Sequence, residues 1–132
     1  MKLTPGKRKG LEAVSDSRGV IGAAAMDQRG SLMSAIAKDK GIDKKAVTKQ
    51  MMSEFKEAVV RVLTPHASAI LLDPEYGLSA AKQRAKNAGL LLAYENSGYD
   101  NTRPGRLPDL LEHYSVPRLL AEGVPARGRV AR

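Results

Sequence analysis

Residues 68–77 read Ser-Ala-Ile-Leu-Leu-Asp-Pro-Glu-Tyr-Gly, and this stretch decides how the rest of the chain can fold. The run from Ser68 to Leu72 shows no polar alternation, which predicts a short strand that is covered on both faces. Asp73 follows directly, Pro74 prevents the strand from continuing, and Gly77 permits a turn. The stretch therefore predicts a buried strand that ends at a carboxylate.

Two further apolar runs share this plan. Gly19–Met26 runs into Asp27, and Gly89–Tyr94 runs into Glu95. Helical sequence lies between the strands, and this alternation predicts a parallel sheet with right-handed crossovers. In parallel α/β sheets and barrels, ligands bind at the carboxyl ends of the strands. We therefore expect both of these acids and Asp73 to share one mouth.

Helices are expected between and around the strands. They span residues 5–14, 32–38, 44–63, 79–87 and 116–122. In the longest helix, apolar residues recur at intervals of three and four, which predicts one buried stripe. The stripe comprises Val47, Met51, Phe55, Val59 and Val62. The opposite, solvent-facing side comprises Lys45, Lys49, Glu54, Lys56, Glu57 and Arg61.

The segments at either end of this α/β pattern have their own expected roles. The first helix is expected to plug the bottom of a barrel, with Leu3, Leu11 and Val14 as its apolar side. A long loop, Asn96–Pro108, follows the third strand at its carboxyl end. Loops of this length at that place are more often functional than mere connectors.

Composition excludes several classes of function. The 132 residues predict one domain without cysteine, so disulfides, thiolate catalysis and zinc–thiolate sites are excluded. His66 and His113 are too few for a histidine metal cluster. We see no signal-peptide core and no run near the roughly 20 apolar residues of a membrane helix, which predicts a cytoplasmic protein. The net charge of +8 is concentrated at the two ends, and four Tyr and one Phe offer little base stacking, which disfavours a nucleic-acid binder.

Clustered carboxylates at the strand ends have two interpretations. Neighbouring like charges raise the pKa of one member and so produce a usable acid or base. Alternatively, the acids cap loops or pair with basic side chains nearby. The candidates are Arg29, Arg84, Arg103 and Arg106. Arg29, in the turn after the first strand, could instead hold a phosphate.

Several long motifs, in order, carry a family resemblance. They are Lys2–Leu11, Met26–Ser31, Ala69–Gly77, Lys86–Glu95, Gly98–Asp100 and Arg103–Asp109. With these motifs, the chain from about Lys2 to Gly123 resembles the tagatose-1,6-bisphosphate aldolase family. The resemblance implies a class I aldolase on a (β/α)8 barrel that needs no metal or other cofactor. Its reaction is retro-aldol cleavage of a phosphorylated ketose to dihydroxyacetone phosphate and glyceraldehyde 3-phosphate, through a lysine Schiff base.

The resemblance also implies site residues. Asp27 and Gln28 would be catalytic, and Arg29, Asp73 and Glu95 would bind substrate. The full-length family is expected to act on a phosphorylated ketose, without nucleic acid or membrane, and to form homo-oligomers.

The chain departs from the family in its length. A barrel of this kind takes roughly 250 residues, whereas this chain offers strands for only part of one. The Schiff-base lysine would come from a later strand, so we expect this chain to be inactive alone. Residues 1–123 are expected to be an N-terminal segment of the barrel, and residues 124–132 an aberrant, disordered basic tail. The alternative is a non-catalytic module that binds a sugar phosphate or a partner.

Overall fold

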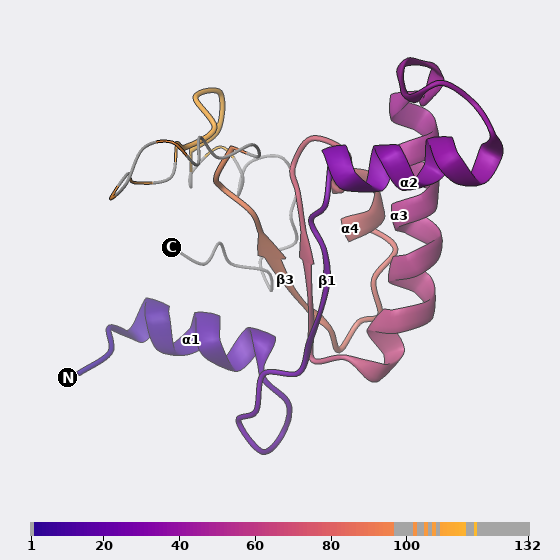
Figure 1. Ribbon diagram of the computed structural model, residues 1–132. Coiled ribbons are helices and arrows are strands. Elements are labelled where there is room, and N and C mark those ends of the chain that lie inside the picture. Colours follow the sequence, from indigo (N-terminus) through magenta and orange to yellow (C-terminus); the bar gives the residue numbers. More distant parts are fainter. Residues whose placement is uncertain are drawn as a thin grey trace.

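A three-stranded sheet forms the centre of the molecule, with most of its helices on one face (Figure 1). The computed structural model describes residues 2–96, 102, 105, 107, 109–115 and 118. The elements run in the order α1 (Pro5–Val14), β1 (Ala23–Met26), α2 (Gly30–Lys40), η1 (Lys44–Ala46), α3 (Lys49–Leu63), η2 (Thr64–His66), β2 (Ala69–Leu72), α4 (Leu78–Ala81) and β3 (Gly89–Leu92).

The sheet is parallel throughout, as the alternation of strands and helices predicts. β2 lies between β1 and β3, and Met26, Leu72 and Leu92 stand side by side in the last row. Within the described part of the chain, β1 and β3 each pair with β2 alone, so the sheet is open. This arrangement confirms the prediction of a partial α/β barrel that does not close.

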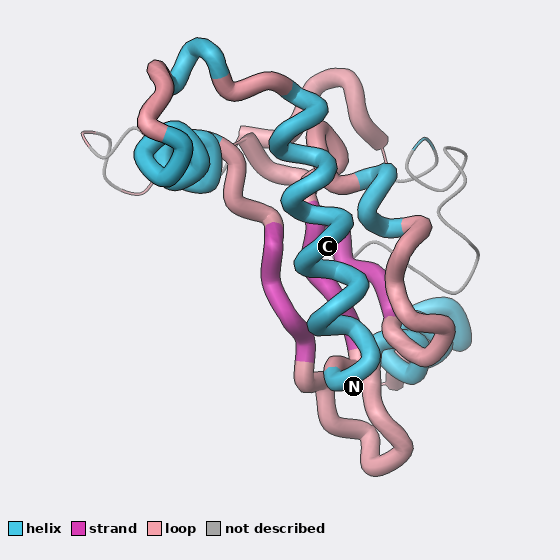
Figure 2. Tube along the Cα trace, turned by 90° about the vertical axis from the view of Figure 1, so that its right-hand side faces the viewer, coloured by secondary structure: helices cyan, strands magenta, loops and turns pink. Residues whose placement is uncertain are grey.

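The core fills the space between the sheet and the helices α3 and α4. It consists of Val60, Ile70, Leu72, Ala80, Ala81, Leu90 and Leu92. Figure 2 shows α3 crossing in front of the strands on this face. Because the buried side chains are aliphatic, the hydrophobic effect fixes the layer, while the hydrogen-bonded ladder fixes its register.

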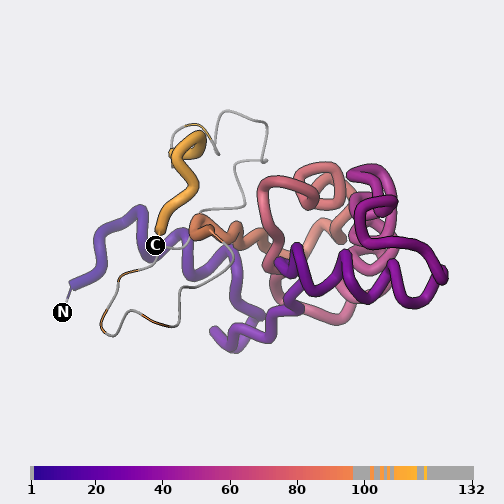
Figure 3. The backbone as a smooth tube through the Cα atoms, turned by 45° about the horizontal axis from the view of Figure 1, so that its top comes forward, coloured from indigo at the N-terminus to yellow at the C-terminus, as the bar shows by residue number. Residues whose placement is uncertain are grey.

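α1 lies on the other side of the molecule from α2 and α3 (Figure 3), near the amino ends of the strands (Figure 1). A Cβ on Gly89 would lie 2.2 Å from the carbonyl oxygen of Ala13, so only glycine allows this close approach. The Ser68 hydroxyl donates to the carbonyl oxygen of Val14 at 2.7 Å and accepts from the backbone N–H of Gly22 at 2.9 Å. α1 therefore lies at the bottom of the sheet, where the sequence predicts a plug, but of the predicted apolar side only Val14 is buried, while Leu3 and Leu11 are exposed.

The long helix differs from its prediction. It begins at Lys49, after a separate turn at η1, and the Thr48 hydroxyl caps it by accepting from the N–H of Met51. Its buried residues are Met52, Lys56 and Val60. Phe55 and Val62, which belong to the predicted stripe, are 41% and 68% exposed.

The predicted stripe is therefore wrong in part, and so is the solvent-facing position of Lys56. Adjacent helical residues are turned by about 100°, so a stripe through Met51 and Phe55 and one through Met52 and Val60 fit the apolar spacing almost equally well. A lysine on the second stripe argued against it, because lysine is almost never fully buried unless it is paired.

Other elements are shorter than predicted. The first strand begins at Ala23 because Gly19, at φ 77°, and a turn closed by the Asp16 carboxylate precede it. The third strand ends at Leu92, and the helix predicted from Ser79 is a single turn, α4. α2 is longer than predicted and ends, as expected, at Gly41 with φ 63°.

Some predictions fall outside the described residues. They are the tail at 124–132, nearly all of the helix at 116–122, most of the loop at 96–108, and the possible partners Arg103 and Arg106.

Candidate functional site

The carboxyl ends of the three strands lie at one edge of the sheet, as expected from their parallel pairing. The register aligns Met26, Leu72 and Leu92, so Asp27 and Asp73 follow directly in neighbouring strands. Glu95 comes three residues after the end of β3. The structure thus brings the three predicted acids to the same edge, but it gives them different surroundings.

Asp73 is fully buried and paired with a lysine. The Lys56 Nζ lies 2.6 Å from the Asp73 Oδ2, and both side chains are 0% exposed. The alternative interpretation, in which strand-end acids pair with basic groups, therefore describes Asp73, although its partner comes from α3 rather than from an arginine. Because the carboxylate has no exposed surface, Asp73 cannot contact a ligand at the carboxyl ends of the strands.

Lys56 also holds the end of β1. Its Nζ donates to the carbonyl oxygens of Met26 at 2.7 Å and Gln28 at 2.8 Å. The Asp73 carboxylate adds an ion pair to these two hydrogen bonds. The buried charge is thus compensated by one ion pair and two carbonyl dipoles.

The other oxygen of Asp73 organises the turn after β2. Its Oδ1 accepts from the backbone N–H groups of Glu75 at 3.0 Å and Tyr76 at 2.8 Å. Gly77 closes the turn: a Cβ there would lie 2.5 Å from the carbonyl oxygen of Asp73. The Ser53 hydroxyl donates to the carbonyl oxygen of Tyr76, which ties the turn to α3.

Tyr76 is held in its neutral form. Burial, followed by the carboxylates of Glu75 and Asp73, raises the pKa of its phenol to about 12, against the opposing charge of Arg29. A phenol that stays protonated at pH 7 can donate a hydrogen bond. Its ring packs against the small cluster of Ile36, Ala37, Val47 and Met52.

Arg29 connects the first and third strand ends. One of its terminal nitrogens donates to the backbone carbonyl of Glu95 at 2.6 Å. Its Nε is buried and has no hydrogen-bond partner among the residues that the structure describes. The guanidinium thus lies at the strand-end edge, and guanidinium groups suit phosphate oxygens.

Asp27 and Gln28, the predicted catalytic pair, keep accessible side chains. Asp27 is half-buried, Gln28 is exposed, and the Glu95 side chain is exposed. The structure thus separates the predicted site residues into an accessible group around Asp27 and a buried group around Asp73. Lys56 is the member that sequence reasoning missed, although its spacing of four from both Met52 and Val60 was a signal for it.

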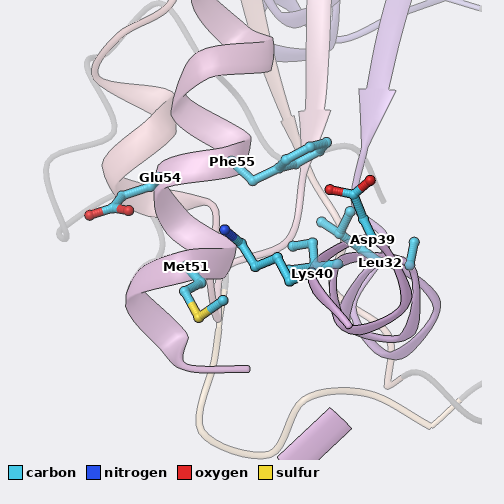
Figure 4. Close-up of a pocket in the computed structure, with 8 residues that line it drawn as sticks. Leu32, Asp39, Lys40, Met51, Glu54 and Phe55 are labelled. Carbon is cyan, nitrogen blue, oxygen red and sulfur yellow. The ribbon is translucent and has the colours of Figure 1, made fainter. Parts of the chain in front are cut away.

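Two hollows differ in their relation to this edge. A cavity of about 330 Å³ lies beside the strand ends and is lined by Glu75, Asn96, Leu111, Glu112, His113 and Tyr114. A groove of about 530 Å³ lies between α2 and α3 on the helical side (Figure 4). Figure 4 shows Phe55 and Lys40 reaching into the space between these helices. The groove is away from the strand-end acids, and the smaller cavity lies beside the ends of β2 and β3 without being lined by any of the predicted site residues.

Two general properties of the described residues bear on the chemistry. No helix among them is long and apolar enough to cross a membrane. Across the same residues, no group of three or more His, Asp or Glu side chains could hold a metal ion.

Comparison with known proteins shows which family the chain belongs to. A family model described as DeoC/LacD family aldolase matches residues 22–126. Tagatose 1,6-diphosphate aldolase 1 of Enterococcus faecalis is 54% identical over 125 residues, which are 95% of this chain and 37% of the relative. Tagatose 1,6-diphosphate aldolase 1 of Streptococcus mutans is 50% identical over 126 residues, 96% of this chain and 38% of the relative. The corresponding enzyme of Listeria monocytogenes is 48% identical over 123 residues, 93% of this chain and 35% of the relative.

The chain thus spans little more than a third of the length of these relatives. The resemblance seen in the strand-end motifs is confirmed, and so is its restriction to part of a barrel. The matched residues include all three strands and the whole Lys56–Asp73 arrangement. This chain belongs to the DeoC/LacD aldolase family.

Proposed function

We propose that this chain contributes three neighbouring strands to a barrel aldolase that cleaves D-tagatose 1,6-bisphosphate. The products would be dihydroxyacetone phosphate and glyceraldehyde 3-phosphate, formed through a lysine Schiff base. The observation that carries the proposal is the identity of about half the residues to tagatose 1,6-diphosphate aldolases, over nearly the whole chain. Phosphorylated sugars are cytoplasmic metabolites, which supports a cytoplasmic location.

The accessible group supplies the contacts with substrate. Asp27 and Gln28 act as the catalytic residues, and their side chains remain accessible at the end of β1. Arg29 binds a substrate phosphate or hydroxyl, which its half-buried position next to Gln28 supports. Glu95 completes the substrate contacts. Asp73 was predicted to bind substrate, but its carboxylate is buried, so it would act indirectly through its ion pair with Lys56.

The chain alone would not cleave the ketose. A Schiff base forms when the lone pair of a neutral, accessible amine attacks the ketone. Among the described residues, Lys56 is the one buried lysine, and its ammonium donates to two carbonyl oxygens and pairs with Asp73, with no exposed surface. It has neither a free lone pair nor a path to the substrate.

A complementation assay tests the proposal. The chain would be mixed with the remaining part of the Enterococcus faecalis relative, and release of triose phosphates from D-tagatose 1,6-bisphosphate would be followed by a coupled assay. We expect neither part to cleave alone and the mixture to cleave. Borohydride trapping with dihydroxyacetone phosphate should then label a lysine of the added part.

Two results would contradict this account. Cleavage by the chain alone would refute the proposed inactivity, as would a borohydride adduct on one of its own lysines. A mixture that shows no cleavage, while dihydroxyacetone phosphate raises the melting temperature of the chain, would favour the alternative of a binding module.

A further inference from the structure

The Lys56 ammonium group binds the backbone on both sides of the proposed catalytic pair, Asp27 and Gln28. Met26 O belongs to the peptide plane immediately before Asp27, and Gln28 O to the plane immediately after Gln28. Lys56 donates to both oxygens, at 2.7 and 2.8 Å. Since a peptide unit is planar, fixing its carbonyl oxygen restricts the orientation of the whole unit. Asp27 and Gln28 therefore lie between two peptide planes that one buried cation holds.

We propose that Lys56 is a positioning residue, which orients Asp27 and Gln28 for the aldol reaction while Asp73 holds it in place. This inference rests on the proposed function for the role of the two residues, but the orientation itself is a property of the chain. It assigns Asp73 a different part from the predicted substrate contact.

Asp73 fixes the position of the Lys56 ammonium group. Its Oδ2 pairs with Lys56 at 2.6 Å, while its Oδ1 accepts from the N–H groups of Glu75 and Tyr76. The carboxylate is thus immobilised by the turn after β2, and the ammonium is immobilised by the carboxylate. The Lys56–Asp73 pair thus fixes the end of β1 relative to the end of β2, beyond the last hydrogen bond between the two strands.

Stability alone does not explain such a pair. Removing two charges from water is costly, and replacement of a buried ion pair by apolar residues of similar volume is often neutral or stabilising. What an apolar pair cannot do is donate two hydrogen bonds to the carbonyls that bracket Asp27. Well-held reacting groups matter because a displacement of about 1 Å can cost on the order of 100-fold in rate.

A double variant separates positioning from packing. Lys56→Met alone would leave the Asp73 carboxylate buried without its cation, so the melting temperature should fall sharply. Lys56→Met with Asp73→Asn removes both charges, and the asparagine oxygen can still accept from Glu75 and Tyr76. We expect the double variant to recover most of the melting temperature. Lys49→Met, at the exposed start of the same helix, is the matched control.

Two measurements on these variants test the positioning role of Lys56. Amide chemical shifts of Asp27, Gln28 and Arg29 in the 132-residue chain should move in the double variant and stay unchanged in the control. In the complemented enzyme, kcat should fall by on the order of 100-fold, while KM changes little.

The outcomes are distinct. A double variant with the wild-type shifts at Asp27 and Gln28 would overturn the positioning role, whatever the activity. Shifts that move while kcat keeps its wild-type value would equally overturn it, because the orientation would then have no bearing on the reaction. If wild-type chain never supports cleavage, the proposed function fails, and the shifts still decide whether Lys56 sets this backbone.

Discussion

The two ends of the sheet are held together by different kinds of contact. At the amino end, α1 docks through small groups: Gly89 allows the backbones to meet, and the Ser68 hydroxyl joins the carbonyl of Val14 to the N–H of Gly22. At the carboxyl end, the buried Lys56–Asp73 pair holds the strand ends. Close packing needs only complementary shape, whereas a buried charge needs its partner. The difference fits the proposed function, in which the buried pair lies behind the accessible residues at the end of β1.

The largest effect should come from breaking the pair on one side. Asp73→Ala leaves the Lys56 ammonium buried without its counter-charge and removes the acceptor for the turn N–H groups. We expect the free energy of unfolding to fall by about 3–5 kcal/mol. Urea denaturation of the chain measures it.

The matched control for that variant is a surface ion pair. Glu57→Ala breaks the contact with Arg61, whose side chain is 56% exposed, and should cost no more than about 1 kcal/mol. If Asp73→Ala cost as little as the control, the pair would not hold the carboxyl end.

At the amino end, the contact between α1 and β3 should respond to added volume. In Gly89→Ala the new Cβ would overlap the carbonyl oxygen of Ala13 and the Val14 side chain, so α1 must shift. We expect a loss of about 1–3 kcal/mol in the free energy of unfolding. Gly22→Ala, where a Cβ meets nothing within 4 Å, is the control and should leave the docking of α1 unchanged.

The Ser68 hydroxyl should contribute less. Ser68→Ala removes one donor and one acceptor between α1, β1 and β2, and a net loss of about 1–2 kcal/mol is expected. Thermal melting compares it with Ser34→Ala, whose hydroxyl bonds only within its own helix. Equal melting temperatures for the two variants would mean that Ser68 does not join the elements.

The smallest effect concerns Tyr76 and pH. Its pKa is raised from 10.0 to about 12, so the folded chain favours the neutral phenol. The resulting stabilisation is fully present below pH 10 and is lost as the pH rises through about 12. Absorbance titration at alkaline pH should show a late step from Tyr76, and Tyr76→Phe should remove that step. A late step that persists in Tyr76→Phe would assign it to another tyrosine.

The sequence predicted the amino end and the layers better than the carboxyl end. Apolar runs before Asp27, Asp73 and Glu95 predicted the parallel strands, because uninterrupted aliphatic residues are typical of strands buried on both faces. β2 and β3 are buried in this way, whereas no residue of β1 is fully buried. α1 could also be placed, since a helix before a first barrel strand has few faces to cover. These features depend on local composition.

The Lys56–Asp73 pair could not be predicted in the same way. Its partners lie 17 residues apart and on different elements, and helical periodicity did not distinguish the stripe through Met52 and Val60 from the one through Phe55. The position of Lys56 becomes evident only when Met26, Gln28 and Asp73 are brought to one edge. Charge on a helix predicts exposure, and a tertiary partner overrides that expectation.

The measurement that tests the central claim most directly is the activity of Asp27→Asn in the complemented enzyme. The claim is that the accessible residues at the end of β1 perform aldol chemistry. The asparagine keeps the size and the backbone of the aspartate, so the melting temperature should stay near that of the wild type. Removing an acid–base group should lower kcat by roughly 100- to 10,000-fold. Cleavage at the wild-type rate by a folded Asp27→Asn variant would contradict the account.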